Sequence, residues 1–136
     1  LTHANLSAAC AQYVETTRGN PPILVEGEER VLVVLPLFHI YSLTVNLLLG
    51  LRLGALLVLH ARFDLDTVMN ELGARQITVF AGVPTMFTAM VNHPKMSALD
   101  LSSRKFCRSG GAPLPAEIEL PPQLNEQIQK VEDAIY

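Results

Sequence analysis

The chain has 136 residues, of which 49% are hydrophobic and 17% are charged, and its net charge is −3 at pH 7. This size fits one domain, and the composition excludes a disordered chain and a coiled coil, both of which carry far more charge. No basic stripe is present, so the sequence gives nucleic-acid binding no electrostatic support.

The N-terminus reads Leu1-Thr2-His3 without an initiator Met, and we therefore expect the chain to be a piece of a longer protein. It does not start with basic residues followed by an apolar run, as a signal peptide would. Cys10 and Cys107 lie outside any metal-binding spacing and are predicted to be reduced, buried thiols of a cytoplasmic protein.

The first half of the chain is predicted to alternate helices and strands. Residues 1–14 form a helix with Thr2 as its N-cap, and a loop follows over 16–27. The aliphatic run 31–35 predicts a strand buried on both faces. A helix over 41–53 ends at Gly54, and a second buried strand is expected over 55–59.

The second half continues the alternation. Asp64 is the predicted N-cap of a helix that stops at Gly73, with Phe63 and Val68 as a hydrophobic staple. The remaining expected elements are a strand over 77–80, a helix from Pro84 that His93-Pro94 ends, a short strand over 105–108 and a last helix from Pro115.

This order predicts an α/β fold, a mainly parallel sheet with helices on both faces. We expect residues 1–118 to form the α/β part and residues 119–136 to be a divergent polar tail or terminal helix. The most apolar stretch, 31–60, is interrupted by Pro36, His39 and Arg52, so a transmembrane segment is not expected, and peripheral membrane association stays open.

Ligands of open α/β sheets bind beyond the carboxyl ends of the strands. That rule selects four segments, which should share one edge of the sheet: 36–39, 60–62, 81–85 and 109–113. Composition and spacing leave two interpretations of each. His39 either offers a hydrogen bond to a ligand or is a satisfied, half-buried histidine. The glycines of 109–111 and Gly82 either admit a ligand close to the backbone or form ordinary turns.

Several patterns are missing. The sequence has no dinucleotide fingerprint, no Walker phosphate loop and no nucleophile elbow, and its four histidines do not have zinc-ligand spacing. We therefore assign no metal ligand and no catalytic residue. Met86, Phe87 and Met90 are interpreted as core.

Four segments in a fixed order carry a family resemblance: Leu1-Thr2-His3-Ala4-Asn5-Leu6, Leu35-Pro36-Leu37-Phe38-His39, Gly82-Val83-Pro84-Thr85 and Ser109-Gly110-Gly111-Ala112-Pro113-Leu114. Together they resemble the adenylate-forming enzymes, and among them the long-chain fatty-acid–CoA ligases. The resemblance implies two steps. A carboxylate first attacks the α-phosphate of ATP, and the coenzyme A thiol then displaces AMP to give a thioester.

The resemblance also implies site residues. Those matching the nucleotide site are Ser109, Gly110, Gly111, Ala112 and Pro113. Those matching the substrate site are His39, Gly82, Val83, Pro84 and Thr85.

The family's phosphate loop, its magnesium-binding Glu segment and its C-terminal domain with the catalytic Lys have no match here. We therefore expect a central piece of the N-terminal domain of a fatty-acid–CoA ligase that is inactive alone. ATP, Mg²⁺ and CoA would serve the parent enzyme, with none held tightly by this piece. The alternative is a non-catalytic nucleotide- or acyl-binding module. Exposed sheet edges are expected to cause self-association.

Overall fold

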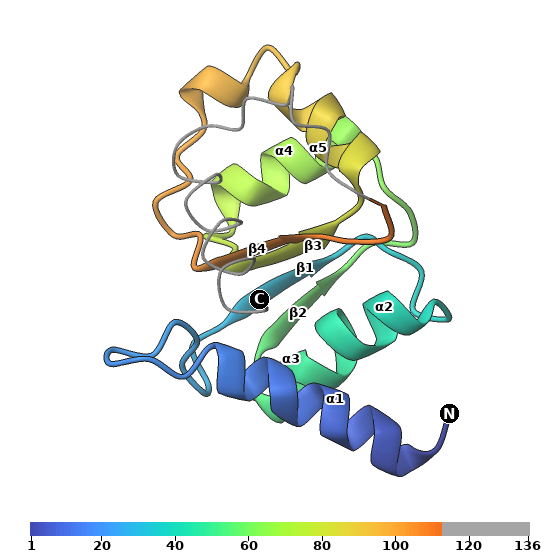
Figure 1. Ribbon diagram of the computed structural model, residues 1–136. Coiled ribbons are helices and arrows are strands. Elements are labelled where there is room, and N and C mark those ends of the chain that lie inside the picture. The colour runs from blue at the N-terminus through green and yellow to red at the C-terminus, as the bar shows by residue number, and fades with distance from the viewer. Residues whose placement is uncertain (113–136) are drawn as a thin grey trace.

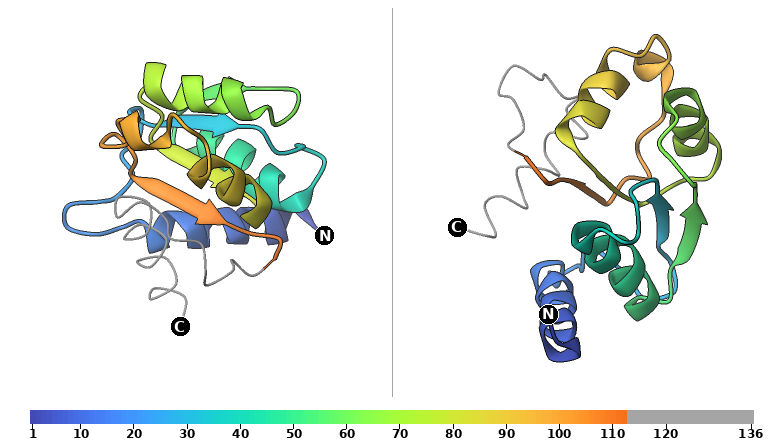
Figure 2. Two further views of the ribbon diagram at one scale, coloured as in Figure 1. Left: turned by 90° about the horizontal axis from the view of Figure 1, so that it is seen from above. Right: turned by 90° about the vertical axis from the view of Figure 1, so that its right-hand side faces the viewer.

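A computed structural model describes residues 1–112, in which four strands form one sheet with helices on both faces (Figures 1 and 2). The predicted helix from Pro115, the tail 119–136 and Pro113 lie outside the described residues. The elements in chain order are α1 (His3–Thr16), β1 (Arg30–Val33), α2 (Ile40–Ser42), the π-helical segment η1 (Leu43–Leu48), α3 (Leu49–Arg52), β2 (Leu56–Leu59), α4 (Leu65–Ala74), β3 (Val79–Gly82), α5 (Pro84–Val91), the 3₁₀ turn η2 (Met96–Ala98) and β4 (Phe106–Ser109).

The sheet confirms the predicted parallel arrangement. Its strand order is β2-β1-β3-β4, and every neighbouring pair is parallel, with Val31 opposite Leu57 on one side and Val79 on the other. Helices α4 and α5 cover one face, while α1 and the α2–η1–α3 run cover the opposite face (Figure 1). All four strands therefore end at the same edge of the sheet.

Strands β1, β3 and β4 each contribute side chains to both hydrophobic cores, because successive side chains of a strand point to opposite faces. Leu32, Phe80 and Cys107 pack in the core under α4 and α5. Val31 and Val79 pack in the core on the other face, with residues of α1 and α3. Phe87 and Met90 are fully buried in the first core, and Met86 packs against it, as predicted.

The predicted helix starts are confirmed by their capping bonds. The Asn5 backbone N–H donates to Thr2 Oγ1 at 3.2 Å, and the Thr2 N–H donates to Asn5 Oδ1 at 2.9 Å, which makes a capping box. The Thr67 N–H donates to Asp64 Oδ1 at 2.9 Å, and Pro84 occupies the first turn of α5.

Three expectations are wrong. The strand over 55–59 is not buried: β2 lies at the edge of the sheet, and Leu56 and Leu59 are 52% and 59% exposed. Gly73 does not stop α4, which continues through Ala74, and the positive φ of 50° falls at Gln76. The third and fourth strands begin only at Val79 and Phe106, where they pair with their neighbours.

A buried ionic cluster lies at the other edge of the sheet, where the strands begin. Glu29, 1% exposed, accepts hydrogen bonds from the Val25 backbone N–H at 2.8 Å, from Lys105 Nζ at 3.0 Å and from the Thr78 hydroxyl. Glu29, Thr78 and Lys105 immediately precede β1, β3 and β4, so one carboxylate ties the starts of three strands together.

Cys10 and Cys107 are both free and buried, as predicted. Within residues 1–112, no helix has the length and apolar character needed to cross a membrane.

Candidate functional site

A pocket of about 450 Å³ opens at the edge where the strands end. The loops after β1, β3 and β4 converge on it. Its wall contains six of the predicted site residues, namely His39, Val83, Pro84, Thr85, Gly111 and Ala112, together with Leu35, Pro36, Phe38 and Tyr41. The structure thus brings together segments that lie far apart in the sequence.

His39 is exposed and caps the short helix α2. Its Nδ1 accepts a hydrogen bond from the Tyr41 backbone N–H at 3.2 Å, so this nitrogen carries no proton. We infer that the ring proton sits on Nε2. The ring is therefore not the satisfied, half-buried histidine of the alternative interpretation: it lines the pocket and offers it one neutral hydrogen-bond donor.

The neighbouring Tyr41 ring explains why position 110 is a glycine. A Cβ at Gly110 would lie 2.5 Å from the Tyr41 ring, so the ring fills the space that the sequence interpretation left to a ligand. The Tyr41 hydroxyl donates to the Arg108 carbonyl oxygen at 3.2 Å. Burial raises the pKa of Tyr41, which keeps the phenol neutral.

Gly82 and Ser109 are the last residues of β3 and β4 and are not among the residues that line the pocket. A Cβ at Gly82 would lie 3.1 Å from the Phe87 ring and 3.3 Å from the Phe80 ring, so core packing accounts for this glycine. Gly111 differs, because its φ of +84° turns the chain into the pocket wall, and a Cβ there would lie 3.6 Å from the Val83 side chain.

The wall of this pocket carries little charge. Its ionisable side chains are those of His39 and Tyr41, and no Lys, Arg, Asp or Glu of residues 1–112 lines it. Among the same residues, no three His, Cys, Asp or Glu side chains are grouped so that they could hold a metal ion. The described residues therefore do not fit Mg²⁺, while the pocket suits an apolar group beside neutral hydrogen-bonding partners.

Two other hollows lie on the part of the chain that the structure describes. One of about 380 Å³ shares Leu35, Pro36 and Phe38 with the first pocket and adds Leu59 and His60. Phe38, 92% exposed, stands between the two.

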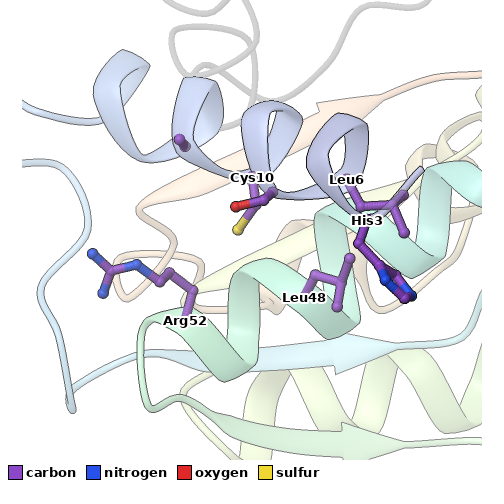
Figure 3. Close-up of a pocket in the computed structure, with 7 residues that line it drawn as sticks. His3, Leu6, Cys10, Leu48 and Arg52 are labelled. Carbon is purple, nitrogen blue, oxygen red and sulfur yellow. The ribbon is translucent and has the colours of Figure 1, made fainter. Parts of the chain in front are cut away.

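A third hollow, of about 390 Å³, lies between α1 and the η1–α3 run, where His3, Leu6 and Cys10 face Leu48 and Arg52 (Figure 3). Arg52 is already paired with Glu26 at 3.3 Å.

Sequence reasoning missed Tyr41 and the Glu29 cluster. A signal for Tyr41 existed, since it lies two residues after His39 at the start of a helix that faces the same edge. No sequence signal pointed to Glu29, because Thr78 and Lys105, the partners that make its burial favourable, follow much later in the chain.

The fold and the pocket are those of an α/β domain with a candidate ligand site at the carboxyl edge of a parallel sheet. Residues 1–126 match the family model described as AMP-binding enzyme, and the chain belongs to that family.

Related proteins agree with this assignment. The chain is 38% identical over 119 residues to 4-coumarate–CoA ligase 3 of Arabidopsis thaliana, covering 88% of this chain and 21% of that protein. It is 34% identical over 122 residues to the long-chain-fatty-acid–CoA ligase of Bacillus subtilis, covering 88% of this chain and 20% of that protein. The crystal structure of the N-terminal domain of FACL13 from Mycobacterium tuberculosis superposes with a TM-score of 0.73 at 25% identity, over 85% of this chain and 27% of that one.

These findings confirm the resemblance to adenylate-forming enzymes. The chain spans about a fifth of the length of the curated relatives it matches.

Proposed function

We propose that this chain is part of a ligase that activates a carboxylic acid with ATP and passes the acyl group to coenzyme A, with a long-chain fatty acid as the substrate. The observation that carries the proposal is the convergence of the loops after β1, β3 and β4 on one apolar pocket, in a chain of the AMP-binding family. The free thiols Cys10 and Cys107 support a cytoplasmic location.

In this proposal the pocket receives the acyl-adenylate. A carboxylate oxygen of the acid bonds to the α-phosphorus of ATP, and pyrophosphate leaves. The thiol of CoA then loses its proton to solvent, its sulfur bonds to the acyl carbon, and the bond from that carbon to AMP breaks, so that AMP leaves. His39 Nε2–H donates a hydrogen bond to the carboxylate oxygen. Val83, Pro84 and Thr85 bound the acyl group, and Gly111 and Ala112 meet the adenine through their backbone and small side chains.

Pro113, which lies outside the described residues, keeps its proposed contact with the adenine. Ser109, Gly110 and Gly82 belong to the same proposed segments. Ser109 and Gly82 end the strands that carry the two loops, and Gly110 lets Tyr41 close one wall. Their part in the proposal is to shape the site.

A second candidate for the acid is a hydroxycinnamate. The relatives named 4-coumarate–CoA ligase are 38% and 39% identical to this chain, against 34% for the relative named long-chain-fatty-acid–CoA ligase. In the intact ligase, we expect adenylation of palmitate to exceed that of 4-coumarate, and the reverse ranking would favour the second acid.

The 136 residues are expected to form no acyl-CoA by themselves. Transfer at a phosphate depends on charges that neutralise its oxygens, and the described wall of this pocket supplies none. The assay mixes the chain with ATP, Mg²⁺, CoA and either acid and measures thioester. Turnover above the background without protein would contradict the expectation.

Binding measurements distinguish a piece of a ligase from a non-catalytic nucleotide- or acyl-binding module. Calorimetry with AMP and with non-hydrolysable palmitoyl- and coumaroyl-adenylate analogues measures affinity for each. A piece of a ligase is expected to bind the analogues weakly and AMP more weakly still, since the described wall holds no charge for phosphate. Tight binding of AMP would favour the module.

A further inference from the structure

A chain of buried hydrogen bonds runs from η1 to the end of β1. Asn46 and Ser42 are both 0% exposed. Asn46 Nδ2 donates to Ser42 Oγ at 3.0 Å, and Ser42 Oγ in turn donates to the Leu35 carbonyl oxygen at 3.0 Å. Buried polar groups are costly unless they are paired, so two of them arranged in series call for an explanation.

The acceptor at the end of this chain opens the loop that carries His39. Leu35 lines the pocket and lies just beyond the last residue of β1, outside the sheet's own ladder. Two further bonds close the same loop: the His39 N–H donates to the Pro36 carbonyl at 3.1 Å, and the Tyr41 N–H donates to His39 Nδ1 at 3.2 Å. The Leu43 backbone N–H also donates to the His39 carbonyl at 2.9 Å, and the Ser42 side chain adds a buried bond between the start of this loop and the helical segment that follows it.

Asn46 decides in which direction the Ser42 hydroxyl points. A serine hydroxyl has one hydrogen and two lone pairs. Because the Asn46 amide donates to Ser42 Oγ, that contact uses a lone pair, and the hydrogen is directed to the Leu35 carbonyl.

This arrangement carries an unfavourable free energy, because it buries a polar atom without a partner in the described part of the chain. Asn46 Oδ1 is buried and finds no hydrogen-bond partner among residues 1–112, so a leucine of similar shape would fit the site with less penalty. The π-helical form of η1, which interrupts an otherwise α-helical run, contains Asn46 and is a feature often found near functional sites.

We propose that Ser42 and Asn46 are positioning residues for the pocket: they hold the Leu35 carbonyl and thereby the loop that presents the His39 imidazole with its proton on Nε2. This inference rests on the proposed function for its catalytic meaning, but the placement of the ring is measurable without any ligand.

The test is the ¹⁵N spectrum of the histidine rings in the labelled 136-residue chain, recorded at a pH where the imidazole is neutral, together with hydrogen exchange of the Tyr41 amide. The variants are Ser42→Ala and Asn46→Leu. The matched control is Thr44→Val, because Thr44 lies in the same buried segment and its hydroxyl bonds only locally, to the Ile40 carbonyl at 2.9 Å.

In the unaltered chain, His39 is expected to show one protonated nitrogen, Nε2. In Ser42→Ala and Asn46→Leu, the two nitrogen shifts should move toward each other as the tautomers mix, and the Tyr41 amide should exchange at least about tenfold faster. Thr44→Val should match the unaltered chain in both measurements.

Unchanged His39 nitrogen shifts in a folded Ser42→Ala or Asn46→Leu chain would overturn the proposal, and so would an equal change in Thr44→Val. If Ser42→Ala does not fold, Asn46→Leu decides alone, since it removes no group that the cores need. Failure of the adenylate analogues to bind would count against the proposed function and would leave this result standing.

Discussion

At the scale of single residues, the Tyr41 ring determines what position 110 can hold. A Cβ there would lie 2.5 to 2.9 Å from three of its ring carbons. The ring is also held at its far end, by the bond from its hydroxyl to the Arg108 carbonyl. A methyl group at position 110 must therefore displace either the ring or the backbone.

Gly110→Ala is therefore expected to destabilise the fold by about 1–3 kcal/mol, the usual cost of overpacking. Urea denaturation gives the change. In a double-mutant cycle with Tyr41→Ala, the cost of Gly110→Ala should shrink, because the ring that it meets is gone. Equal costs in the presence and absence of the ring would show that the clash is not the cause.

The N-cap of α4 gives a pH-dependent prediction. Hydrogen bonds from the Thr67 hydroxyl and backbone N–H hold the pKa of Asp64 below its usual value. A carboxylate whose pKa is lower in the folded state than in the unfolded state stabilises the fold fully at pH values above the unfolded pKa of about 3.9. That contribution is lost as the pH falls through the pKa of the folded state.

Asp64→Ala should lower the urea midpoint at neutral pH, and its difference from the unaltered chain should narrow below about pH 4. Asp64→Asn is the matched control, because asparagine also caps helices and does not titrate here. A gap for Asp64→Ala that stays constant down to acidic pH would contradict the linkage.

At the scale of elements, the Glu29 cluster joins strands that are far apart in sequence. Glu29 has no exposed side-chain surface, whereas its partner Lys105 is 33% exposed. Removing the lysine leaves a carboxylate buried with only its neutral donors, which is unfavourable even though solvent reaches part of the pair.

Lys105→Ala is expected to cost about 2 kcal/mol, the range of a hydrogen bond to a charged group. Lys95→Ala is the control, since Lys95 bonds to the Asn70 side chain on the surface, and its effect should lie within about 0.5 kcal/mol. Chemical denaturation of both variants measures the difference. Equal stability of the two would mean that Glu29 is held by Val25 and Thr78 alone.

The elements also show what the sequence can reveal. Thr2, Asp64 and Pro84 are predictable as helix starts because capping is decided within one turn of chain. The exposure of β2 is not predictable, because it follows from strand order, and strand order depends on which distant segments pair. The starts of β3 and β4 are misplaced for the same reason: Val79 and Phe106 begin their strands where partners lie opposite.

The candidate site, like the fold, could be predicted only in part from the sequence. The rule that ligands bind at the carboxyl ends of parallel strands is enough to bring His39, Val83, Thr85 and Gly111 to one pocket. It could not show that the missing side chain at Gly110 makes room for a protein ring, because Tyr41 reaches that position from α2, far away in the sequence.

At the scale of the whole molecule, β2 has no partner strand on one side among residues 1–112, and this edge carries two exposed aliphatic side chains, Leu56 and Leu59. An unpaired strand edge carries free backbone donors and acceptors and invites pairing with another chain. We therefore predict that the 136 residues self-associate as their concentration rises.

Light scattering over a concentration series measures this association. Leu56→Lys combined with Leu59→Lys should lower the average mass, since charged side chains discourage edge pairing. Leu51→Lys is the control, because Leu51 is 63% exposed but lies on α3 and not on the strand edge. A clean monomer at every concentration would contradict the prediction.

The pocket is the feature on which the proposed function depends, and a residue-resolved titration tests it most directly. The labelled chain is titrated with a non-hydrolysable acyl-adenylate analogue, and backbone and histidine-ring shifts are followed by NMR. We predict saturable shifts, in fast exchange, at His39, Tyr41, Val83, Thr85 and Gly111, with little change at His3 and Cys10 in the hollow beside α1. Shifts that gather at α1, or none that saturate, would contradict the assignment of the ligand to the carboxyl edge of the sheet.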